Sequence, residues 1–173
     1  MEKLYEFKPQ DALGKVGEKM FAETNAEFGP VKQEDKSWID FILTRIPPWT
    51  TSNKVEVKTD EMSQKTWNIF VEQYVVKNKP YDGGPWRAQK SDANYVHFAR
   101  CNDTFYWFKP EQLIDFIGRA GFRCITGAPN KNGSYAIGYL IPVERLEKLE
   151  KDTLLYKQVY DKTRKTDSNP RTA

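Results

Sequence analysis

Two neighbouring stretches of the sequence constrain the fold more than any other feature. The first, Trp38–Leu43, is an apolar run that contains one acid, Asp40. The second, Lys54–Thr59, alternates charged with apolar residues. Alternation is typical of a half-buried strand, because successive side chains of a strand leave opposite faces. We therefore predict two adjacent strands, with Glu56 and Lys58 pointing the same way from the second.

Asp40 is the unusual residue of the first stretch, because it stands between Ile39 and Phe41 in a run that otherwise belongs in a core. A buried carboxylate without a partner costs several kcal/mol, so we expect Asp40 to have one. A divalent cation is one such partner, and a structural ion pair with Lys58 is the other. The alternation of the second stretch is also what a half-exposed strand without any function has.

Two carboxylates and one ammonium meeting at one place would suit phosphodiester cleavage. Hard Mg²⁺, held by carboxylates and water, neutralises the charge that develops on the phosphate oxygens. We predict Asp40, Glu56 and the main-chain carbonyl of Val57 as ligands of Mg²⁺, with Mn²⁺ as a substitute. Lys58 would orient the attacking water or help to deprotonate it.

Histidine and cysteine content excludes other kinds of site. His97 is the single histidine, so a His-based metal cluster is excluded and a Ser-His-Asp triad is disfavoured. Cys101 and Cys124 are isolated thiols, which fit a reducing compartment and not a zinc site. No apolar window of about 18 residues exists to span a membrane, and the first residues lack a signal-peptide core. We therefore expect a cytoplasmic location.

Local patterns predict the remaining elements and a mixed α/β (α+β) fold. A helix is expected through residues 11–21, a third strand at Asn68–Val76, and an antiparallel meander of the first three strands, since short links join them. Residues 31–37 are expected to form a charged connector. Further along, we predict a helix from Ser91 to Ala99, a strand at Thr104–Phe108, and a helix that starts at Pro110 and ends just before Gly121. Two hairpin strands follow at Phe122–Thr126 and Ser134–Ile141, and then a helix at Val143–Lys151. The central mixed sheet should have four to five strands, flanked by helices. One domain is expected over residues 1–155, and a flexible basic tail over residues 156–173.

Residues 77–90 are expected to form an exposed loop that contacts nucleic acid. The segment combines basic and aromatic residues with two Gly and two Pro. The net charge of +3 permits a nucleic-acid partner without requiring one. Tyr81 or Trp86 would stack on an exposed base. The groups predicted to bind phosphates are Lys77, Lys79, Arg87, Lys90 and Ser91. A solvated surface loop is the alternative interpretation.

The spacing of Asp40 and Glu56-Val57-Lys58, sixteen residues apart, resembles the pattern of PD-(D/E)XK nucleases. The run Glu56-Val-Lys-Thr-Asp60 followed by Thr66-Trp-Asn-Ile-Phe-Val-Glu72 is similar to phage and archaeal members of Holliday-junction-resolvase type. The resemblance covers roughly residues 11–120. Ile39 replaces the Pro of the pattern, Trp67 stands where relatives often have Gly, and the linker 44–53 is longer than expected.

The resemblance implies a restriction-endonuclease-like core and a metal-dependent endonuclease. Glu18 would be the helical glutamate often found in the superfamily, and Glu72 a further ligand or outer group. Branched or structured DNA would be the substrate, a homodimer the working form, and the cytosol of a bacterium or of a phage-infected host the location. Two alternatives stay open: an inactive module of the same fold that binds DNA or a host protein, and an RNA-directed nuclease.

Overall fold

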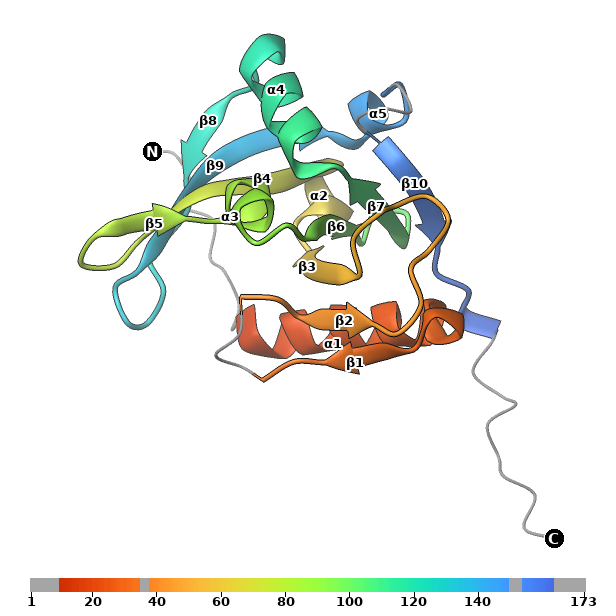
Figure 1. Cartoon of the computed structure of the whole chain (residues 1–173). Coiled ribbons are helices and arrows are strands. Elements are labelled where there is room, and N and C mark those ends of the chain that lie inside the picture. The colour runs from red at the N-terminus through yellow and green to blue at the C-terminus, as the bar shows by residue number, and fades with distance from the viewer. Residues whose placement is uncertain (1–9, 35–37, 150–153, 164–173) are drawn as a thin grey trace, which may run out of the picture.

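Two β-sheets and a small number of helices build the protein, for which the computed structural model describes residues 10–34, 38–149 and 154–163 (Figure 1). The helices are α1 (Gln10–Thr24), the 3₁₀ turn η1 (Ala26–Phe28), α2 (Ser63–Thr66), α3 (Gly84–Lys90), α4 (Pro110–Ala120) and α5 (Val143–Leu146). The strands are β1 (Pro30–Lys32), β2 (Phe41–Leu43), β3 (Lys54–Asp60), β4 (Asn68–Val76), β5 (Pro80–Asp82), β6 (Asn94–Ala99), β7 (Thr104–Phe108), β8 (Cys124–Thr126), β9 (Tyr135–Pro142) and β10 (Leu154–Val159).

The larger sheet has six strands in the order β1-β2-β3-β6-β7-β10. Only β3 and β6 pair in parallel, and Glu56 stands opposite Tyr95 there and Lys58 opposite His97. All other neighbours pair antiparallel. The expected mixed α/β architecture is therefore confirmed, with a larger sheet than the four to five strands predicted.

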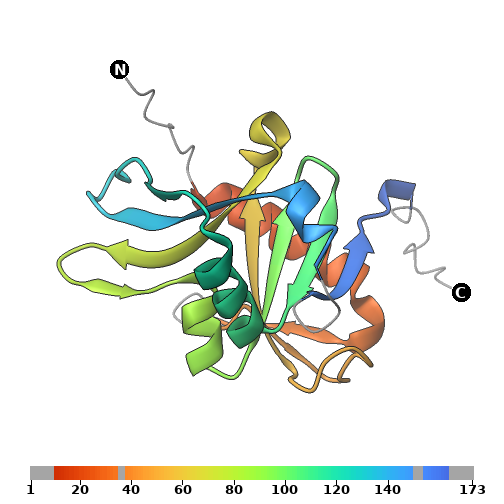
Figure 2. The same ribbon diagram turned by 90° about the horizontal axis from the view of Figure 1, so that it is seen from above.

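The second sheet is antiparallel and has the order β5-β4-β9-β8. It lies over one face of the six-stranded sheet together with α3 and α4, whereas α1 covers the opposite face (Figures 1 and 2). The predicted antiparallel meander is wrong, because β4 leaves the first sheet after α2 and pairs with β9 instead. The predicted hairpin is confirmed as β8 and β9.

Each face of the six-stranded sheet has its own hydrophobic core. On the α1 side, Phe21 shares a core with Val55 and Val57, and its ring centroid lies 5.5 Å from that of Trp107. On the other side, Tyr95 of β6 and Tyr106 and Phe108 of β7 share a core with Ile69 of β4 and with Leu113 and Ile117 of α4. The predicted alternation in β3 is therefore confirmed. Its valines face α1, and its charged residues face the side covered by the second sheet and α3.

Gly17 explains how α1 approaches β3. A Cβ atom at this position would stand 1.7 Å from Oγ1 of Thr59, so only glycine permits this packing. At Gly14, one turn earlier, a Cβ atom would meet no described atom within 4 Å. The helix expected over residues 11–21 is confirmed, and it continues to Thr24.

Four predicted segments differ from the structure. The stretch expected as a helix from Ser91 is the strand β6, and Ser91 follows the end of α3 instead of starting a helix. The expected exposed loop 77–90 contains β5 and α3. Part of the expected connector 31–37 pairs with β2 as β1. The expected tail from residue 156 begins within β10, which pairs with β7.

Other boundaries shift less. The first predicted strand begins at Phe41 rather than Trp38. The helix expected at Val143–Lys151 ends at Leu146, and residues 150–153 lie outside the described ranges. No helix in the described part of the chain is long and apolar enough to cross a membrane.

Candidate functional site

The charged face of β3 is where the predicted site residues meet. Glu56 and Lys58 point to the same side, with Lys58 Nζ 3.5 Å from Glu56 Oε1. Their side lies against β4 and α3, which contribute Glu72 and Arg87. We call Asp40, Glu56, Lys58, Glu72 and Arg87 the acid–lysine cluster.

Glu56 is almost completely buried, at 2% exposure. Its Oε1 accepts a hydrogen bond of 2.5 Å from the guanidinium of Arg87 and also faces Lys58. Its Oε2 is buried and has no hydrogen-bond partner. A buried carboxylate needs compensation by cations, and here two cations lie at one oxygen while the other oxygen remains without a contact of this kind.

Lys58 stays protonated at neutral pH. Partial burial by itself would lower the pKa of this ammonium, but the carboxylates of Glu56, Glu72 and Asp40 outweigh burial and the repulsion from Arg87, so the pKa lies above its ordinary value. Among the described residues, the ion pair of Lys58 is with Glu56, at 3.5 Å, whereas the carboxylate of Asp40 pairs with Lys32.

Asp40 reaches the cluster from the residue just before β2. Its main-chain N–H donates to the carbonyl of Val55, and its Oδ2 accepts the N–H of Val57 at 2.7 Å. Because the N–H and C=O of one strand residue point to the same side, the carbonyl of Val57 also points toward the side where Asp40 lies.

Glu18 is connected to Asp40 through a residue that the sequence analysis did not single out. Lys32 Nζ lies 2.9 Å from Glu18 Oε2 and 3.6 Å from Asp40 Oδ1. Glu18 therefore stands one ion pair away from Asp40, on the α1 side. Lys32 belongs to β1, and the short Pro30-Val31-Lys32 segment carries no alternation that predicts a strand.

Glu72 on β4 explains the two glycines that begin α3. A Cβ atom at Gly83 would lie 2.3 Å from Oε1 of Glu72, and one at Gly84 would lie 2.3 Å from its main-chain oxygen. Gly84 also has a positive φ of 46°. The Gly-Gly pair lets α3 start directly beside Glu72 and so presents Arg87, one turn later, to Glu56.

The residues fit a hard divalent cation in part. Glu56 has a buried oxygen without a partner, and Asp40 and the Val57 carbonyl add oxygen donors of the kind that Mg²⁺ prefers. Among the described residues there is no group of three or more His, Cys, Asp or Glu side chains that could hold a metal ion. A cation here would therefore be held by two carboxylates, the Val57 carbonyl and water, with Arg87 as its competitor at Glu56.

The residues predicted to bind nucleic acid do not all lie in an exposed loop. Lys77 and Lys79 are exposed between β4 and β5. Trp86 packs on the hydrophobic core and stacks on Tyr139 at 6.2 Å between centroids. Lys90 forms an ion pair with Asp82. Ser91 caps the C-terminus of α3, and its carbonyl accepts a hydrogen bond from Lys54.

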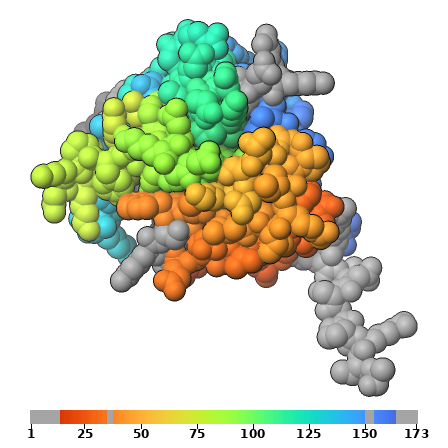
Figure 3. All heavy atoms as spheres, viewed as in Figure 1, coloured from red at the N-terminus to blue at the C-terminus, as the bar shows by residue number. Residues whose placement is uncertain are grey.

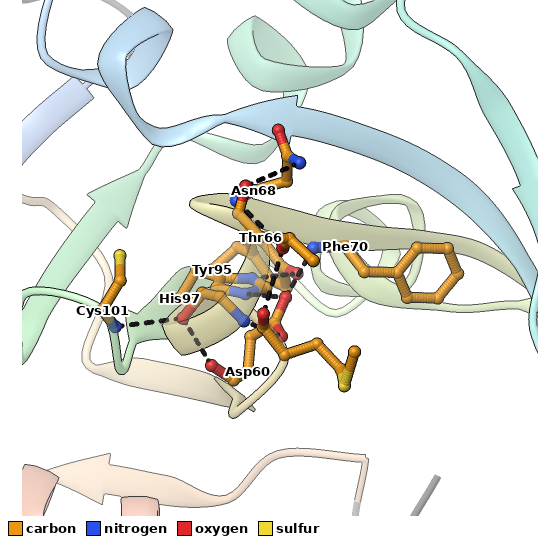
Figure 4. A network of polar contacts seen from close by, with 9 residues as sticks. Asp60, Thr66, Asn68, Phe70, Tyr95, His97 and Cys101 are labelled. Atoms are coloured by element: carbon orange, nitrogen blue, oxygen red, sulfur yellow. Dashed lines mark hydrogen bonds and ion pairs between the residues drawn. The ribbon is translucent and has the colours of Figure 1, made fainter. Parts of the chain in front are cut away.

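A second polar group lies farther along the same face of β3 and holds the two sheets together (Figure 4). Asp60 accepts the N–H of Phe70 on β4 at 2.6 Å and the N–H of Ser63 on α2 at 3.2 Å. The Tyr95 hydroxyl lies 3.1 Å from Nδ1 of His97, and Nε2 of His97 lies 3.6 Å from Asp60 Oδ2. Burial, and then the carboxylates of Glu56, Glu72 and Asp60, raise the pKa of Tyr95 well above its ordinary value, so it remains a neutral hydroxyl.

Sequence reasoning missed Arg87 as a partner of Glu56. The only available signal was Gly83-Gly84-Pro85, which combines flexible residues with a proline suited to the first turn of a helix. The contact of Arg87 with Trp38 was missed as well. Trp38 is 59% exposed, and the guanidinium of Arg87 lies 4.8 Å from the centroid of its ring.

Comparison with known proteins adds no relative. No protein-family model, no curated protein sequence and no solved structure matches this chain.

Proposed function

We propose that this protein is a metal-dependent nuclease of PD-(D/E)XK type that hydrolyses phosphodiester bonds of DNA. The observation that carries the proposal is the buried carboxylate of Glu56, with Oε1 3.5 Å from Nζ of Lys58, beside Asp40, whose Oδ2 accepts the N–H of the intervening Val57 at 2.7 Å. Asp40 stands directly before β2, which pairs antiparallel with β3, the strand of Glu56 and Lys58; acids from two adjacent strands are what the resemblance to PD-(D/E)XK nucleases implies.

Each residue has a role in this proposal. Asp40, Glu56 and the carbonyl of Val57 hold Mg²⁺, which when bound neutralises charge on the phosphate and favours ionisation of water. Lys58 positions the attacking water and stabilises negative charge on the phosphate oxygens. Glu72 adds to the larger effect of Glu56 in keeping Lys58 charged, and Glu18 acts from outside through Lys32. Branched DNA and a homodimer are the substrate and assembly that the resemblance implies.

A specific observation supports the second candidate, a module of this fold that binds nucleic acid or protein without cutting. Arg87 occupies the oxygen of Glu56 with a hydrogen bond of 2.5 Å. In a catalytic site this ion pair must yield to, or coexist with, the cation. In a binding module it is simply the compensation that a buried carboxylate requires.

One incubation separates the two candidates. Supercoiled, linear, single-stranded and four-way DNA, and a matching single-stranded RNA, are mixed with the protein with and without Mg²⁺ or Mn²⁺. We expect cleavage that needs the metal and falls at least about a hundredfold in Asp40→Asn, Glu56→Gln and Lys58→Ala. Asp115→Asn is the control, because this exposed acid pairs with Arg119 on α4, away from the cluster. Full activity in any of the three variants contradicts the assigned roles.

Metal binding provides an independent measurement. A cation that binds only the folded state raises the melting temperature, by an amount that grows with the logarithm of the ratio of its concentration to its Kd. We expect Mg²⁺ to stabilise the wild-type protein and Asp115→Asn equally, and not to stabilise Glu56→Gln. No cleavage of any substrate, together with no metal-dependent stabilisation, would leave the binding module as the function.

A further inference from the structure

Two exposed aromatic rings from distant parts of the chain lie together next to the acid–lysine cluster. Trp38 precedes β2 and is 59% exposed, and Tyr81 belongs to β5 and is 42% exposed. Their ring centroids are 6.1 Å apart, and the ring planes are inclined by 52°. We call these two residues the aromatic pair.

Arg87 connects the aromatic pair to the cluster. Its guanidinium lies 4.8 Å from the centroid of the Trp38 ring and donates to Glu56 at 2.5 Å. A cation over an aromatic face is favourable, so Arg87 holds the Trp38 ring in a defined position. The side chain of Arg87 therefore contacts both the exposed ring of Trp38 and the buried carboxylate of Glu56.

The surroundings of the aromatic pair are basic. The β4–β5 hairpin projects from the body of the molecule beside α3 (Figures 1 and 3). Lys77 and Lys79 are exposed where the chain passes from β4 to β5. Aromatic rings combined with lysines are the surface that binds single-stranded nucleic acid, because bases stack on the rings and phosphates pair with the ammonium groups.

We propose that the aromatic pair is a stacking site for an unpaired nucleobase, so that the protein engages a single-stranded segment next to the bond that it cuts. The position of this site relative to the cut rests on the proposed function, whereas the stacking itself does not. Inside a duplex the base faces are covered by their neighbours and cannot reach Trp38, and a blunt duplex exposes a base face only at its two ends. Single strands, flaps and the unpaired parts of branched substrates present such faces.

The test measures binding without a metal, so that nothing is cleaved. Fluorescence anisotropy in EDTA compares a labelled oligo(dT), an abasic strand of the same length and a blunt duplex. We expect wild-type protein to bind oligo(dT) more tightly than the other two. Trp38→Ala should weaken oligo(dT) binding about tenfold, and Trp38→Phe should retain most of the affinity because it keeps a ring.

Trp67 is the matched control. It is 57% exposed, nearly the same as Trp38, and stands between α2 and β4. Trp67→Ala should change oligo(dT) affinity less than twofold. Equal affinity of Trp38→Ala and wild type for oligo(dT), equal binding of abasic and normal strands, or no binding of oligo(dT) overturns the stacking site.

Failure of this inference can be told apart from failure of the proposed function. Metal-dependent cleavage with no effect of Trp38→Ala on binding removes the stacking site and leaves the nuclease. Trp38-dependent binding of oligo(dT), with no cleavage under Mg²⁺ or Mn²⁺, removes the nuclease and leaves a single-strand binding surface.

Discussion

The guanidinium of Arg87 contacts two groups that lie far from it in the sequence, the carboxylate of Glu56 and the ring of Trp38. Glu56 is nearly fully buried, so its charge is compensated mainly by this contact and by Lys58. At the scale of single residues, Arg87 is therefore both a structural partner of the proposed metal ligand and its competitor.

The strength of this pair can be measured by a double-mutant cycle. Arg87→Met keeps an apolar stem but leaves the Glu56 charge with one partner fewer, so we expect the free energy of unfolding to fall by roughly 3 kcal/mol. In Arg87→Met/Glu56→Gln the loss should be much smaller than the sum of the single losses. Urea denaturation provides the measurement.

Lys90→Met is the control on the same helix. Its ammonium pairs with Asp82 but is largely exposed, and pairs of that kind contribute about 0–1 kcal/mol. Additive effects of the Arg87 and Glu56 substitutions would mean that the two side chains do not stabilise each other.

At the scale of elements, a local sequence pattern accounts for the helical conformation of α1, and a tertiary contact accounts for one of its glycines. The apolar spacing of its sequence predicts the helix, and its two glycines weaken it. The structure explains why a glycine is needed at position 17, because the missing Cβ leaves room for Thr59 of β3, but it shows no such need at Gly14.

The two glycines should therefore respond in opposite directions to alanine. Gly14→Ala should raise the free energy of unfolding by about 0.5–1 kcal/mol, since alanine is the better helix former and meets no described atom. Gly17→Ala should lower it by about 1–3 kcal/mol, because the added methyl group overlaps Thr59. Chemical denaturation followed by circular dichroism measures both, and a change of the same sign in both variants would contradict this packing.

At the scale of the whole molecule, Glu147 ties the end of the second sheet to the first. It follows α5, which continues from β9, and its Oε1 accepts the Tyr106 hydroxyl of β7 at 2.6 Å. Its other oxygen pairs with Lys157 of β10. Burial by itself would raise the pKa of Glu147, but the hydrogen bonds from Lys157 and Tyr106 lower the pKa below its ordinary value.

This contact predicts a pH-dependent stability. A lowered carboxyl pKa contributes stability that is present above the unfolded-state pKa, about 4.3, and is lost as the pH falls through the folded-state pKa. Glu147→Gln should therefore destabilise the protein at pH 7 by on the order of 1 kcal/mol, and the difference should shrink below about pH 4.

Melting curves of the two proteins between pH 3 and pH 8, roughly the range in which carboxyl groups titrate, measure this effect. Glu144→Gln is the control, since Glu144 is exposed on the neighbouring α5. A difference between Glu147→Gln and wild type that stays constant down to the lowest pH would mean that charge on Glu147 contributes nothing.

The sequence by itself determined the elements whose local pattern has one interpretation. The alternation of β3, the β-prone runs of β4 and β7, and the helix α4 with Pro110 at its start and Gly121 after its end all occur where predicted. The shared face of Glu56 and Lys58 follows from the same strand periodicity. These features depend only on residues a few positions apart in the chain, so they can be predicted from the sequence alone.

Only the tertiary structure decided the rest. Every residue of β6 is buried because the strand lies between β3 and β7 with both faces covered, so it lacks the alternation that marks a half-exposed strand. β10 exists through its pairing with β7, and α3 through the space that Gly83 and Gly84 leave beside Glu72. The pairing of Arg87 with Glu56 depends on these same long-range contacts, which no local pattern encodes.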